Sequence, residues 1–380
     1  MKFSARVGRK VVAGVVACIA LAACAPTTQR VRVSDGAAEI EARKQRQIAL
    51  QAYLEDQQRL LRVSYPLLTR GSDLCGEDIR YTTGMALANS STLLTEAFRE
   101  TAESVYKLSN TVQAVYVVPG SAADKAGVRS GDTLIQLGSW PVSGNDTEVV
   151  KQALTQIKEL TRNGQPLRID VQRKGKNGML QSQSLLITPD RACSYPVVLG
   201  NGDEVNAYAD GNQVVVQRGM MRFATSDTEL GLVISHEIAH NSMGHMRAKM
   251  TNYTLGTILD IATQLLLKVP TQGLFGSLGG NAFSQGFESE ADYVGLYIMA
   301  QAGGDIDNAP QFWRRMATLS PGSIQSSHTA THPATPERFV ALEETVREIK
   351  AKKAAGQPLT PNLKNAPDIK ADPLLPPAKP

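Results

Sequence analysis

Two histidines stand four residues apart in the apolar run VISHEIAHNSMGH, residues 233–245. On an α-helix, positions four apart lie about 40° from each other on one face. A helical run would therefore bring His236 and His240 to one zinc ion, which binds imidazole nitrogens at about 2.0–2.1 Å. Glu237 would point near the metal without binding it, where it could accept a proton from water. The spacing predicts a helix that carries part of a hydrolytic zinc site; an ordinary helix with surface histidines is the alternative.

The third histidine of this run does not fit the same geometry. His245 is nine positions past His236, or about 180° around a continuing helix, so we expect a structural role near the helix end. The extended pattern with a third histidine ligand would need that residue at position 246, which is Met246. A catalytic zinc usually keeps three protein ligands. The third ligand must therefore come from another segment.

The acidic segment FESEADYVG, residues 287–295, offers that ligand. On an expected helix, Glu288 and Asp292 share one face and Glu290 points away. One of the pair would bind the metal, and the other would hold a ligand histidine in orientation.

The combination of HExxH with ExxxD resembles the HtpX and BepA type of zinc metallopeptidase, the family that includes the CAAX prenyl proteases. Three further stretches agree with it: VNAYADGNQVVVQRGMM, EADYVGLYIMAQAG and THPATPERF. The resemblance covers about residues 200–345. It implies the following roles: zinc ligands His236, His240 and Glu288, general base Glu237, and Asp292 as the residue that orients a ligand histidine.

The resemblance also implies a role near the metal for His332, which lies in the His-Pro stretch. It could assist the transition state or act as a gating fourth ligand, and a merely structural histidine is the alternative. His328 is a weaker candidate for this position. Arg338 is expected to pair with an acidic neighbour.

The N-terminal residues resemble the export signal of a bacterial lipoprotein. The basic segment MKFSARVGRK precedes VVAGVVACIALAA, an apolar run too short for a membrane span of about 20 residues. It ends in LAAC, which resembles a lipobox and implies cleavage before Cys24 and lipidation of that cysteine. Because Ala25 follows, the resemblance favours the outer membrane. A secreted protein cleaved near Ala23 is the alternative.

Two cysteines, Cys75 and Cys193, remain after the signal and the lipidated residue are set aside. In an exported chain they most simply pair with each other, although two free thiols are the alternative. They lie at the two ends of a segment whose sequence pattern differs from that of the rest of the chain. A disulfide between them would bring its two ends together, which is the layout expected of one domain inserted into another.

The stretch VVPGSAADKAGVRSGDTLIQLGSWPV, residues 117–142, resembles a PDZ domain of the bacterial protease-associated type. We expect Ser121 to cap a short helix and Gly127 to end it. A helix over 146–162 and two strands joined at 175–178 should follow. PDZ domains bind extended peptides at a sheet edge. The loop TTGMAL departs from the usual apolar-Gly-apolar pattern, so binding of C-termini does not follow from the resemblance, and an unrelated small α+β module is the alternative.

These observations predict an α+β chain with a zincin-like, mostly helical metallopeptidase domain and an inserted PDZ-like β domain. The expected segments are a signal peptide at 1–23, a tether at 24–36, an N-terminal helix packing on the peptidase domain at 37–72, a PDZ-like domain at 73–195, a peptidase domain at 196–350 and a disordered Pro/Lys/Ala-rich tail at 351–380.

Several elements are expected inside these segments. Pro66 and Gly71 should end the N-terminal helix. In the peptidase domain we expect a helix over 228–248, an edge strand at 213–217 that could align a substrate, a buried core helix at 253–269 in preference to a membrane-dipping one and a mobile Gly-rich segment at 273–286.

The charge balance argues against nucleic acid as a partner. The formal charge is +4, but four of the 40 basic residues, Lys2, Arg6, Arg9 and Lys10, lie in the export signal, which has no acidic residue. The remainder has 36 basic and 36 acidic residues. No basic stripe is left to bind nucleic acid.

The sequence therefore predicts a zinc metalloendopeptidase with one zinc ion per chain, lipid-anchored on the periplasmic face of the bacterial envelope, at the outer membrane. Its expected partners are unfolded or misassembled envelope proteins as substrates, peptide segments at the PDZ groove and the membrane through the lipid anchor. The alternative is a PDZ-based chaperone or assembly factor with a latent or idle zinc site. A third hypothesis is a latent protease held shut by His332 or by the segment 273–286.

Overall fold

The computed structural model describes residues 28, 31–93, 95–175, 177–267, 274, 284–319, 336–362 and 364. Residues 1–48 and 49–380 form two separate compact units. The helices are α2 (Asp35–Arg70), α3 (Arg99–Ser104), α4 (Ala122–Lys125), α5 (Thr147–Thr161), α6 (Arg218–Phe223), α7 (Asp227–Ser242), α8 (His245–Leu267), α10 (Ser284–Gln301), α11 (Ala309–Ala317) and α12 (Pro336–Ala354), with 3-10 turns η1 (Ser72–Cys75) and η2 (Glu96–Phe98).

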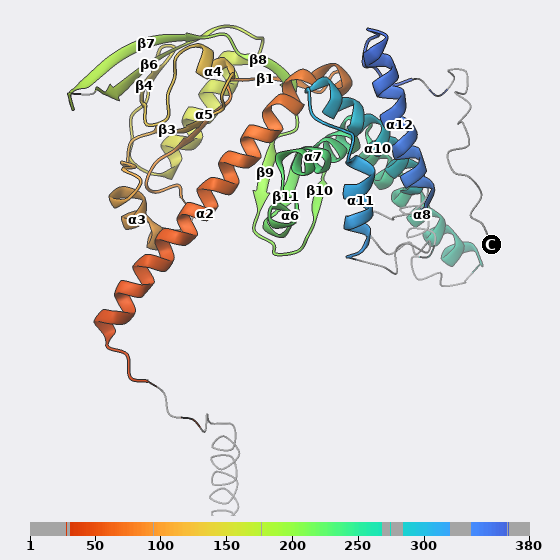
Figure 1. Ribbon diagram of the computed structural model, residues 1–380, viewed down its shortest axis with the longest axis horizontal. Coiled ribbons are helices and arrows are strands. Elements are labelled where there is room, and N and C mark those ends of the chain that lie inside the picture. Colours follow the sequence, from red (N-terminus) through yellow and green to blue (C-terminus); the bar gives the residue numbers. More distant parts are fainter. Residues whose placement is uncertain are drawn as a thin grey trace, which may run out of the picture. The chain divides into compact units, whose positions relative to one another are not determined.

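The strands are β1 (Ile79–Thr82), β2 (Met85–Ala88), β3 (Gln113–Val117), β4 (Thr133–Leu137), β5 (Trp140–Pro141), β6 (Leu167–Lys174), β7 (Leu180–Ile187), β8 (Asp190–Cys193), β9 (Val197–Gly200), β10 (Ala207–Ala209) and β11 (Val214–Gln217) (Figure 1). The chain thus combines a sheet-rich region (β1 to β8) with a helical C-terminal region (β9 to α12), as an α+β class requires.

Helix α2 does not end at Pro66. It continues through Pro66 to Arg70, so the prediction that Pro66 ends the helix is wrong. Proline removes one backbone donor from a helix interior, but burial holds the last turn in place, since Leu67 is 2% and Leu68 5% exposed. The helix ends where Gly71 follows, and a Cβ at that position would lie 2.6 Å from the Leu67 carbonyl oxygen.

Helix α2 contributes to two hydrophobic cores. Leu60, Val63 and Leu67 belong to the core of the helical C-terminal region. Leu50 instead packs with Ala88 of β2 in a small separate core. The helix therefore packs on the sheet-rich region as well as on the helical region, where contact with the peptidase part alone was expected.

The sheet-rich region is built on an antiparallel sheet with strand order β2-β3-β4-β6-β7, and β5 pairs with β4. Helix α5 buries Val149 and Ala153 against strands of this sheet, including Ile169 of β6. The helix, the two long strands and their connecting turn lie where the sequence predicts them. Ser121 caps α4 as expected, because its Oγ accepts a hydrogen bond from the Asp124 amide at 3.3 Å.

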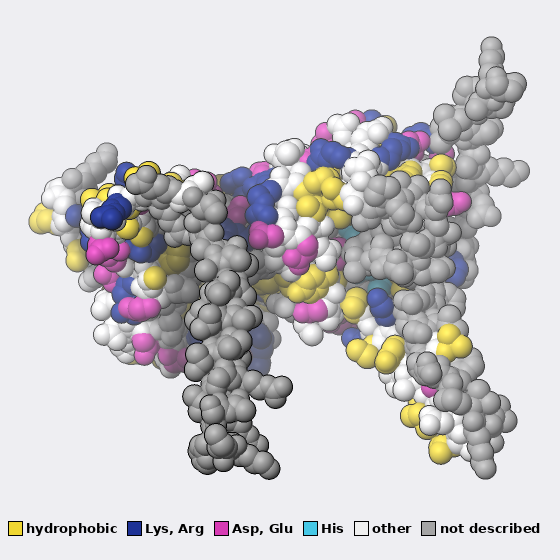
Figure 2. Space-filling view, turned by 90° about the horizontal axis from the view of Figure 1, so that it is seen from below, with side chains coloured by type: hydrophobic (Ala, Val, Ile, Leu, Met, Phe, Trp, Pro, Cys, Tyr) yellow, Lys and Arg dark blue, Asp and Glu magenta, His cyan; other side chains and the backbone are white. Residues whose placement is uncertain are grey.

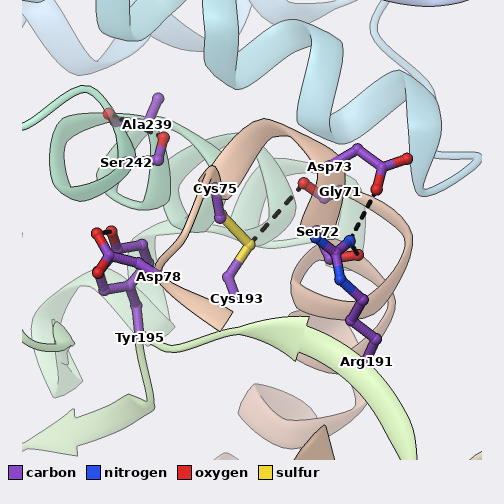
Figure 3. Close-up of a disulfide and its surroundings, with 10 residues drawn as sticks. All are labelled: Gly71, Ser72, Asp73, Cys75, Asp78, Arg191, Cys193, Tyr195, Ala239 and Ser242. Atoms are coloured by element: carbon purple, nitrogen blue, oxygen red, sulfur yellow. Dashed lines mark hydrogen bonds and ion pairs between the residues drawn. A yellow bond between two sulfur atoms is a disulfide. The ribbon is translucent and has the colours of Figure 1, made fainter. Parts of the chain in front are cut away.

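Cys75 and Cys193 form a disulfide with Cα atoms 5.6 Å apart (Figure 3). Beside it, β1 and β8 pair antiparallel with Ile79 opposite Cys193. The two chain segments that lead into and out of the sheet-rich region therefore run side by side. Ala239 and Ser242 of α7 lie next to the disulfide in Figure 3.

A three-stranded sheet with strand order β10-β11-β9 packs beside α7. The central strand, β11, pairs antiparallel with β10 and parallel with β9, and all four of its residues are buried. The prediction that residues 213–217 form an edge strand is therefore wrong. Among the described residues, the outer strands of this sheet are β10 and β9.

The expected helix over 228–248 is two helices. Helix α7 ends at Ser242, and α8 begins at His245. Gly244 between them takes a φ of +70°, a left-handed conformation that ends a helix and that glycine adopts without a steric penalty. This break changes where the side chain of His245 can reach.

Helix α8 is not the buried core helix expected at 253–269. Leu255, Ile258 and Leu259 are each 56% exposed and Leu265 is 74% exposed. Figure 2 shows hydrophobic side chains at the surface at its lower right, where α8 lies. No helix in the described part of the chain is long and apolar enough to cross a membrane. Most of the Gly-rich segment 273–286 lies outside the described residues.

The prediction of a disordered tail at 351–380 places the start of the tail too early in the chain. Helix α12 runs to Ala354, and the chain after it lies against the helices. The Gln301 side chain donates a hydrogen bond to the Leu359 carbonyl at 2.7 Å, and Lys352 donates to the Thr360 carbonyl at 2.7 Å. Leu359 also packs against the helical core. Isolated contacts of this kind have no periodicity, so the sequence pattern did not reveal them.

Candidate metal centre

Helix α7 presents the two histidines of the opening motif side by side. Its N-terminus is capped by Ser226, whose Oγ accepts a hydrogen bond from the Glu229 amide at 3.1 Å. The ring centroids of His236 and His240 are 4.7 Å apart, and their Nε2 atoms are 3.1 Å apart. Exposure is 2% for His236, 7% for His240 and 3% for the intervening Glu237. The helix thus buries three polar side chains at one place.

Glu288 of α10 completes a triangle of donor atoms. Its Oε2 lies 3.5 Å from His236 Nε2, and its Oε1 lies 3.3 Å from His240 Nε2. Ligands bound to a tetrahedral zinc at about 2.0–2.1 Å are about 3.3–3.4 Å from one another. The two Nε2 atoms are 3.1 Å apart, and each lies 3.3 or 3.5 Å from a different oxygen of the Glu288 carboxylate, which is close to this value. The donor types and their spacing therefore fit one zinc ion.

Close packing of α10 on α7 makes this triangle possible. A Cβ at Gly295 would lie 3.0 Å from both the Cα and the amide nitrogen of His236. Because glycine has no side chain, α10 can approach the backbone of α7 at the level of the ligand histidine. The acidic residues one and two turns earlier in α10 then reach the imidazoles.

Asp292 holds His236 from the side opposite the metal position. Its Oδ1 lies 3.0 Å from His236 Nδ1, while His236 Nε2 faces Glu288 and His240. An Nδ1 proton donated to Asp292 leaves the Nε2 lone pair for a metal. Asp292 itself is held by two hydrogen bonds from Arg338, at 2.8 and 2.9 Å. The expected acidic partner of Arg338 is thus identified.

The ionisation of this cluster favours positive charge at its centre, either a proton on His236 or a metal ion that displaces this proton. Burial alone would lower the pKa of His236, but hydrogen bonds with Asp292 and Glu288 outweigh it and raise that pKa to about 10. Burial would raise the pKa of Asp292, but the charges of Arg338 and His236 lower it on balance. Burial lowers the pKa of His240 and favours its neutral form, the form that binds metal.

His245 belongs to this cluster, although helix geometry excluded it. Because α7 ends before Gly244, the ring of His245 turns back, and its Nδ1 lies 3.0 Å from His240 Nδ1. Its Nε2 lies 2.9 Å from Oε2 of Glu290, the residue expected to point away from the site. His245 is 3% exposed, and burial lowers its pKa. The Met-Gly pair before His245 was the signal that could have revealed the break.

Trp313 of α11 also borders the site, and sequence reasoning missed it. Its ring centroid lies 5.0 Å from that of His236, and the Arg338 guanidinium carbon lies 6.0 Å from the Trp313 ring. No spacing in the sequence links this residue to the motif. His328, His332 and Cys24, by contrast, lie outside the described residues.

Sequence comparison finds similarity to a peptidase family and to metalloproteases, which agrees with a metal site of this kind. The model of Peptidase family M48 matches residues 171–346. The chain is similar to a beta-barrel assembly-enhancing protease of Yersinia pestis, with 29% identity over 40% of this chain and 34% of the relative. It is also similar to the metalloprotease LoiP of Escherichia coli (strain K12), with 32% identity over 36% of this chain and 56% of that protein.

A mitochondrial metalloendopeptidase, OMA1 of Arabidopsis thaliana, is 29% identical over 40% of this chain and 31% of its own length. The matches to these three relatives thus span between 31% and 56% of each relative. Among solved structures, the HtrA3 PDZ domain bound to a phage-derived ligand aligns with 30% of this chain at 17% identity, with a TM-score of 0.21. A likeness of that size carries no argument about the sheet-rich region.

Proposed function

We propose that this chain, whose residues 171–346 match the model of Peptidase family M48, is a zinc-dependent endopeptidase of the bacterial cell envelope. Its substrates would be misfolded or misassembled envelope proteins. The observation that carries the proposal is the buried triangle of His236, His240 and Glu288, whose donor atoms lie close enough together to hold one zinc ion. The names of the relatives, a beta-barrel assembly-enhancing protease and the metalloprotease LoiP, support the reaction and the envelope location.

The three ligands have fixed roles in this proposal. His236 and His240 each offer an Nε2 lone pair, and Glu288 offers a carboxylate oxygen. Zinc bound there supplies a Lewis acid, which polarises a peptide carbonyl and makes water nucleophilic near neutral pH. Asp292 keeps His236 in the tautomer that binds metal. Arg338 balances the charge of the two buried carboxylates beside it.

Glu237 is proposed to move the proton. It follows the ligand His236 on α7 and is 3% exposed, so it would act in a site from which bulk water is largely excluded. As general base it would accept a proton from the attacking water and then deliver it to the amine that leaves. Neither transfer requires another side chain.

The substrate is proposed to bind as an extended strand along β10 rather than β11. β11 has partners on both sides, whereas β10 is an outer strand of its sheet within the described ranges. An extended peptide can add its backbone to such an edge. β10 also packs beside α7, the helix that carries the two histidines.

The sheet-rich region is proposed to be an inserted PDZ-like module at 73–195 that binds exposed peptide segments. In support, β2 is one of the two outer strands of its sheet within the described residues, and the disulfide joins the two ends of the segment. The peptidase domain would follow at 196–350, with 37–72 as its N-terminal helix. Cleavage after residue 23, a tether at 24–36 and lipidation of Cys24 would anchor the protein on the periplasmic face of the outer membrane.

A PDZ-based chaperone with an idle zinc site is less well supported. A structural zinc normally has four protein ligands, whereas three candidate ligands are grouped in the described part of the chain. Gating by His332 remains part of the proposal as a regulatory step. An increase in activity on replacing His332 with Ala would support it, and an inactive, zinc-free variant would contradict it.

Replacement of Glu237 with Gln tests the proposed reaction. The amide keeps the size of the side chain but cannot act as the base, so cleavage of unfolded casein should fall by about 100-fold or more. Zinc content measured on the same preparation should stay at one ion per chain. The matched control is Glu159→Gln on α5, far from the motif in sequence, which should cleave as wild type does. Equal activity of Glu237→Gln and wild type would overturn the proposal.

A further inference from the structure

Two hydrogen-bond contacts connect the ligand His240 to the protein surface. His240 Nδ1 lies 3.0 Å from His245 Nδ1, and His245 Nε2 lies 2.9 Å from Glu290 Oε2. His245 is 3% exposed, whereas the side chain of Glu290 is 54% exposed. These three side chains, His240, His245 and Glu290, form a row that starts at the buried triangle and ends at a carboxylate in contact with solvent.

The positions of the protons in this row follow from the chemistry of its ends. A carboxylate only accepts hydrogen bonds, so the Nε2 of His245 must carry a proton. A neutral imidazole has one N–H, which leaves Nδ1 of His245 as an acceptor. His240 must then donate from its own Nδ1, and its Nε2 keeps a lone pair. That Nε2 is the atom that faces His236 and Glu288.

The reverse arrangement would oppose metal binding, because the proton on the ligand nitrogen would first have to move. If His245 Nδ1 carried the proton and donated to His240 Nδ1, the single proton of a neutral His240 would sit on Nε2. That proton would point into the triangle and exclude a metal ligand bond. The acceptor at Glu290 therefore selects, through His245, the tautomer of His240 that can bind zinc.

Packing fixes the ring of His245 in the orientation that this role needs. Its ring stacks on Phe287 with centroids 4.6 Å apart and planes at 19°. It meets His240 edge-on, at 77° and 5.0 Å. Gly244 turns the chain into this position with its φ of +70°. The ring is therefore held in place by both packing and hydrogen bonds.

We propose that His245 and Glu290 are positioning residues that fix the tautomer and orientation of the zinc ligand His240. This inference rests on the proposed zinc site. Helix α10 would then support both ligand histidines, with Asp292 acting directly on His236 and Glu290 acting through His245 on His240. Loss of such an outer partner typically weakens metal binding by about 10–100-fold.

Two matched pairs of variants of the full-length protein test the proposal. His245→Phe keeps a ring that can stack on Phe287 but removes the acceptor, whereas His245→Asn offers an amide oxygen near the position of Nδ1. Glu290→Lys replaces the acceptor by a donor at a half-exposed site, whereas Glu290→Gln keeps an acceptor oxygen. We expect His245→Phe and Glu290→Lys to bind zinc about 10–100-fold more weakly than wild type. The zinc affinities of the matched variants His245→Asn and Glu290→Gln should stay closer to that of wild type.

Zinc affinity measured by competition with a chelator is the first readout, and it does not depend on catalytic activity. The second is the pair of ¹⁵N chemical shifts of His240 in the metal-free protein, which report which ring nitrogen carries the proton. We expect an Nδ1 proton in wild type, His245→Asn and Glu290→Gln, and loss of that pattern in His245→Phe and Glu290→Lys.

Wild-type zinc affinity and an unchanged His240 pattern in His245→Phe and Glu290→Lys would overturn the positioning role. Equal weakening in His245→Phe and His245→Asn, with an unchanged His240 pattern, would also overturn it, because it would indicate a purely structural residue. Failure of the wild-type protein itself to bind zinc would instead overturn the proposed function. The two failures are therefore distinguishable.

Discussion

Arg338 donates two hydrogen bonds to Asp292, from Nε at 2.8 Å and from Nη2 at 2.9 Å. Its Nη1 lies 3.2 Å from Glu288 Oε2. Both carboxylates and the guanidinium are buried, with exposures of 4% for Glu288, 5% for Asp292 and 6% for Arg338. One cation from α12 therefore balances the carboxylate that orients His236 and the carboxylate in the proposed ligand triangle.

Removal of Arg338 should strongly destabilise the protein. In Arg338→Met, the apolar side chain fills similar space but leaves two buried carboxylates without their cation. Breaking a buried ion pair from one side costs about 3–5 kcal/mol. We expect a loss of that size in the free energy of unfolding of the metal-free protein, measured by urea with tryptophan fluorescence. Trp313, beside Arg338, would report the transition.

The matched control is Arg314→Met. Arg314 also forms a short ion pair, at 2.6 Å to Glu343, but both side chains are 39% exposed. Exposed ion pairs contribute about 0–1 kcal/mol, so this variant should unfold near the wild-type urea concentration. Equal losses in the two arginine variants would contradict the interpretation of Arg338 as a buried charge balance.

The local part of the site could be predicted from the sequence. The four-residue spacings of His236 with His240, and of Glu288 with Asp292, each specify one helix face, because helix periodicity is fixed by backbone geometry. Their assembly into one site depends on how α7 and α10 pack. Nothing in the local pattern indicates that Gly295 would sit against His236, although the resemblance supplied that pairing of segments.

The missed features depend on breaks and on distant partners. His245 was excluded because one helix was assumed to continue past Ser242, whereas the left-handed Gly244 ends it. β11 was expected at an edge, but β9, which is not adjacent to it in the sequence, pairs with its second side. Periodicity describes one element at a time, so it cannot report which side of a strand is occupied.

Asn241 should control the position of β10, the outer strand along which the substrate is proposed to bind. Its Oδ1 accepts a hydrogen bond from the Gly211 amide at 2.8 Å, and its Nδ2 donates to the Gln213 carbonyl at 3.0 Å. These bonds attach the turn between β10 and β11 to α7, one residue after His240. Asn241→Ala should cost about 1–3 kcal/mol of stability. It should also lower kcat/KM for unfolded casein while zinc content stays unchanged.

Asn212→Ala is the control for this prediction. Asn212 lies in the same turn but its side chain is exposed, so stability and kcat/KM should remain near wild type. A normal kcat/KM in Asn241→Ala, with stability reduced, would restrict the role of Asn241 to folding. Loss of zinc in Asn241→Ala would contradict the prediction that the turn between β10 and β11 can be altered without an effect on metal binding.

The disulfide should stabilise the chain mainly through its unfolded state. Cys75 and Cys193 are 118 residues apart in sequence, and closing a loop of about 100 residues is worth up to about 4.7 kcal/mol in the chain-entropy account. The double variant Cys75→Ala with Cys193→Ala should therefore lose about 2–5 kcal/mol in urea unfolding. A reducing agent should destabilise the wild type and leave the double variant unchanged; equal sensitivity of both would contradict the prediction.

Asp227 should make stability depend on pH in the acid range. It accepts hydrogen bonds from Arg59 at 3.0 Å and Arg62 at 3.0 Å, which join α2 to the first turn of α7. Burial would raise the pKa of Asp227, but these two arginines lower it on balance. The unfolded chain, with a carboxyl pKa of about 3.9, then binds more protons than the folded one between the two pKa values. Stability therefore rises with pH across that window.

The contribution of Asp227 should be fully present above about pH 4 and be lost as the pH falls through its lowered folded pKa. Asp227→Asn should cost about 1 kcal/mol at pH 7, since the carboxylate is half-exposed. This difference should shrink in high salt and vanish at the acid end of a urea series from pH 7 to pH 2. Asp203→Asn, which alters a pair whose carboxylate is 88% exposed, should change stability less at every pH. A cost of Asp227→Asn that stays constant down to pH 2 would contradict the ionic origin of the contact.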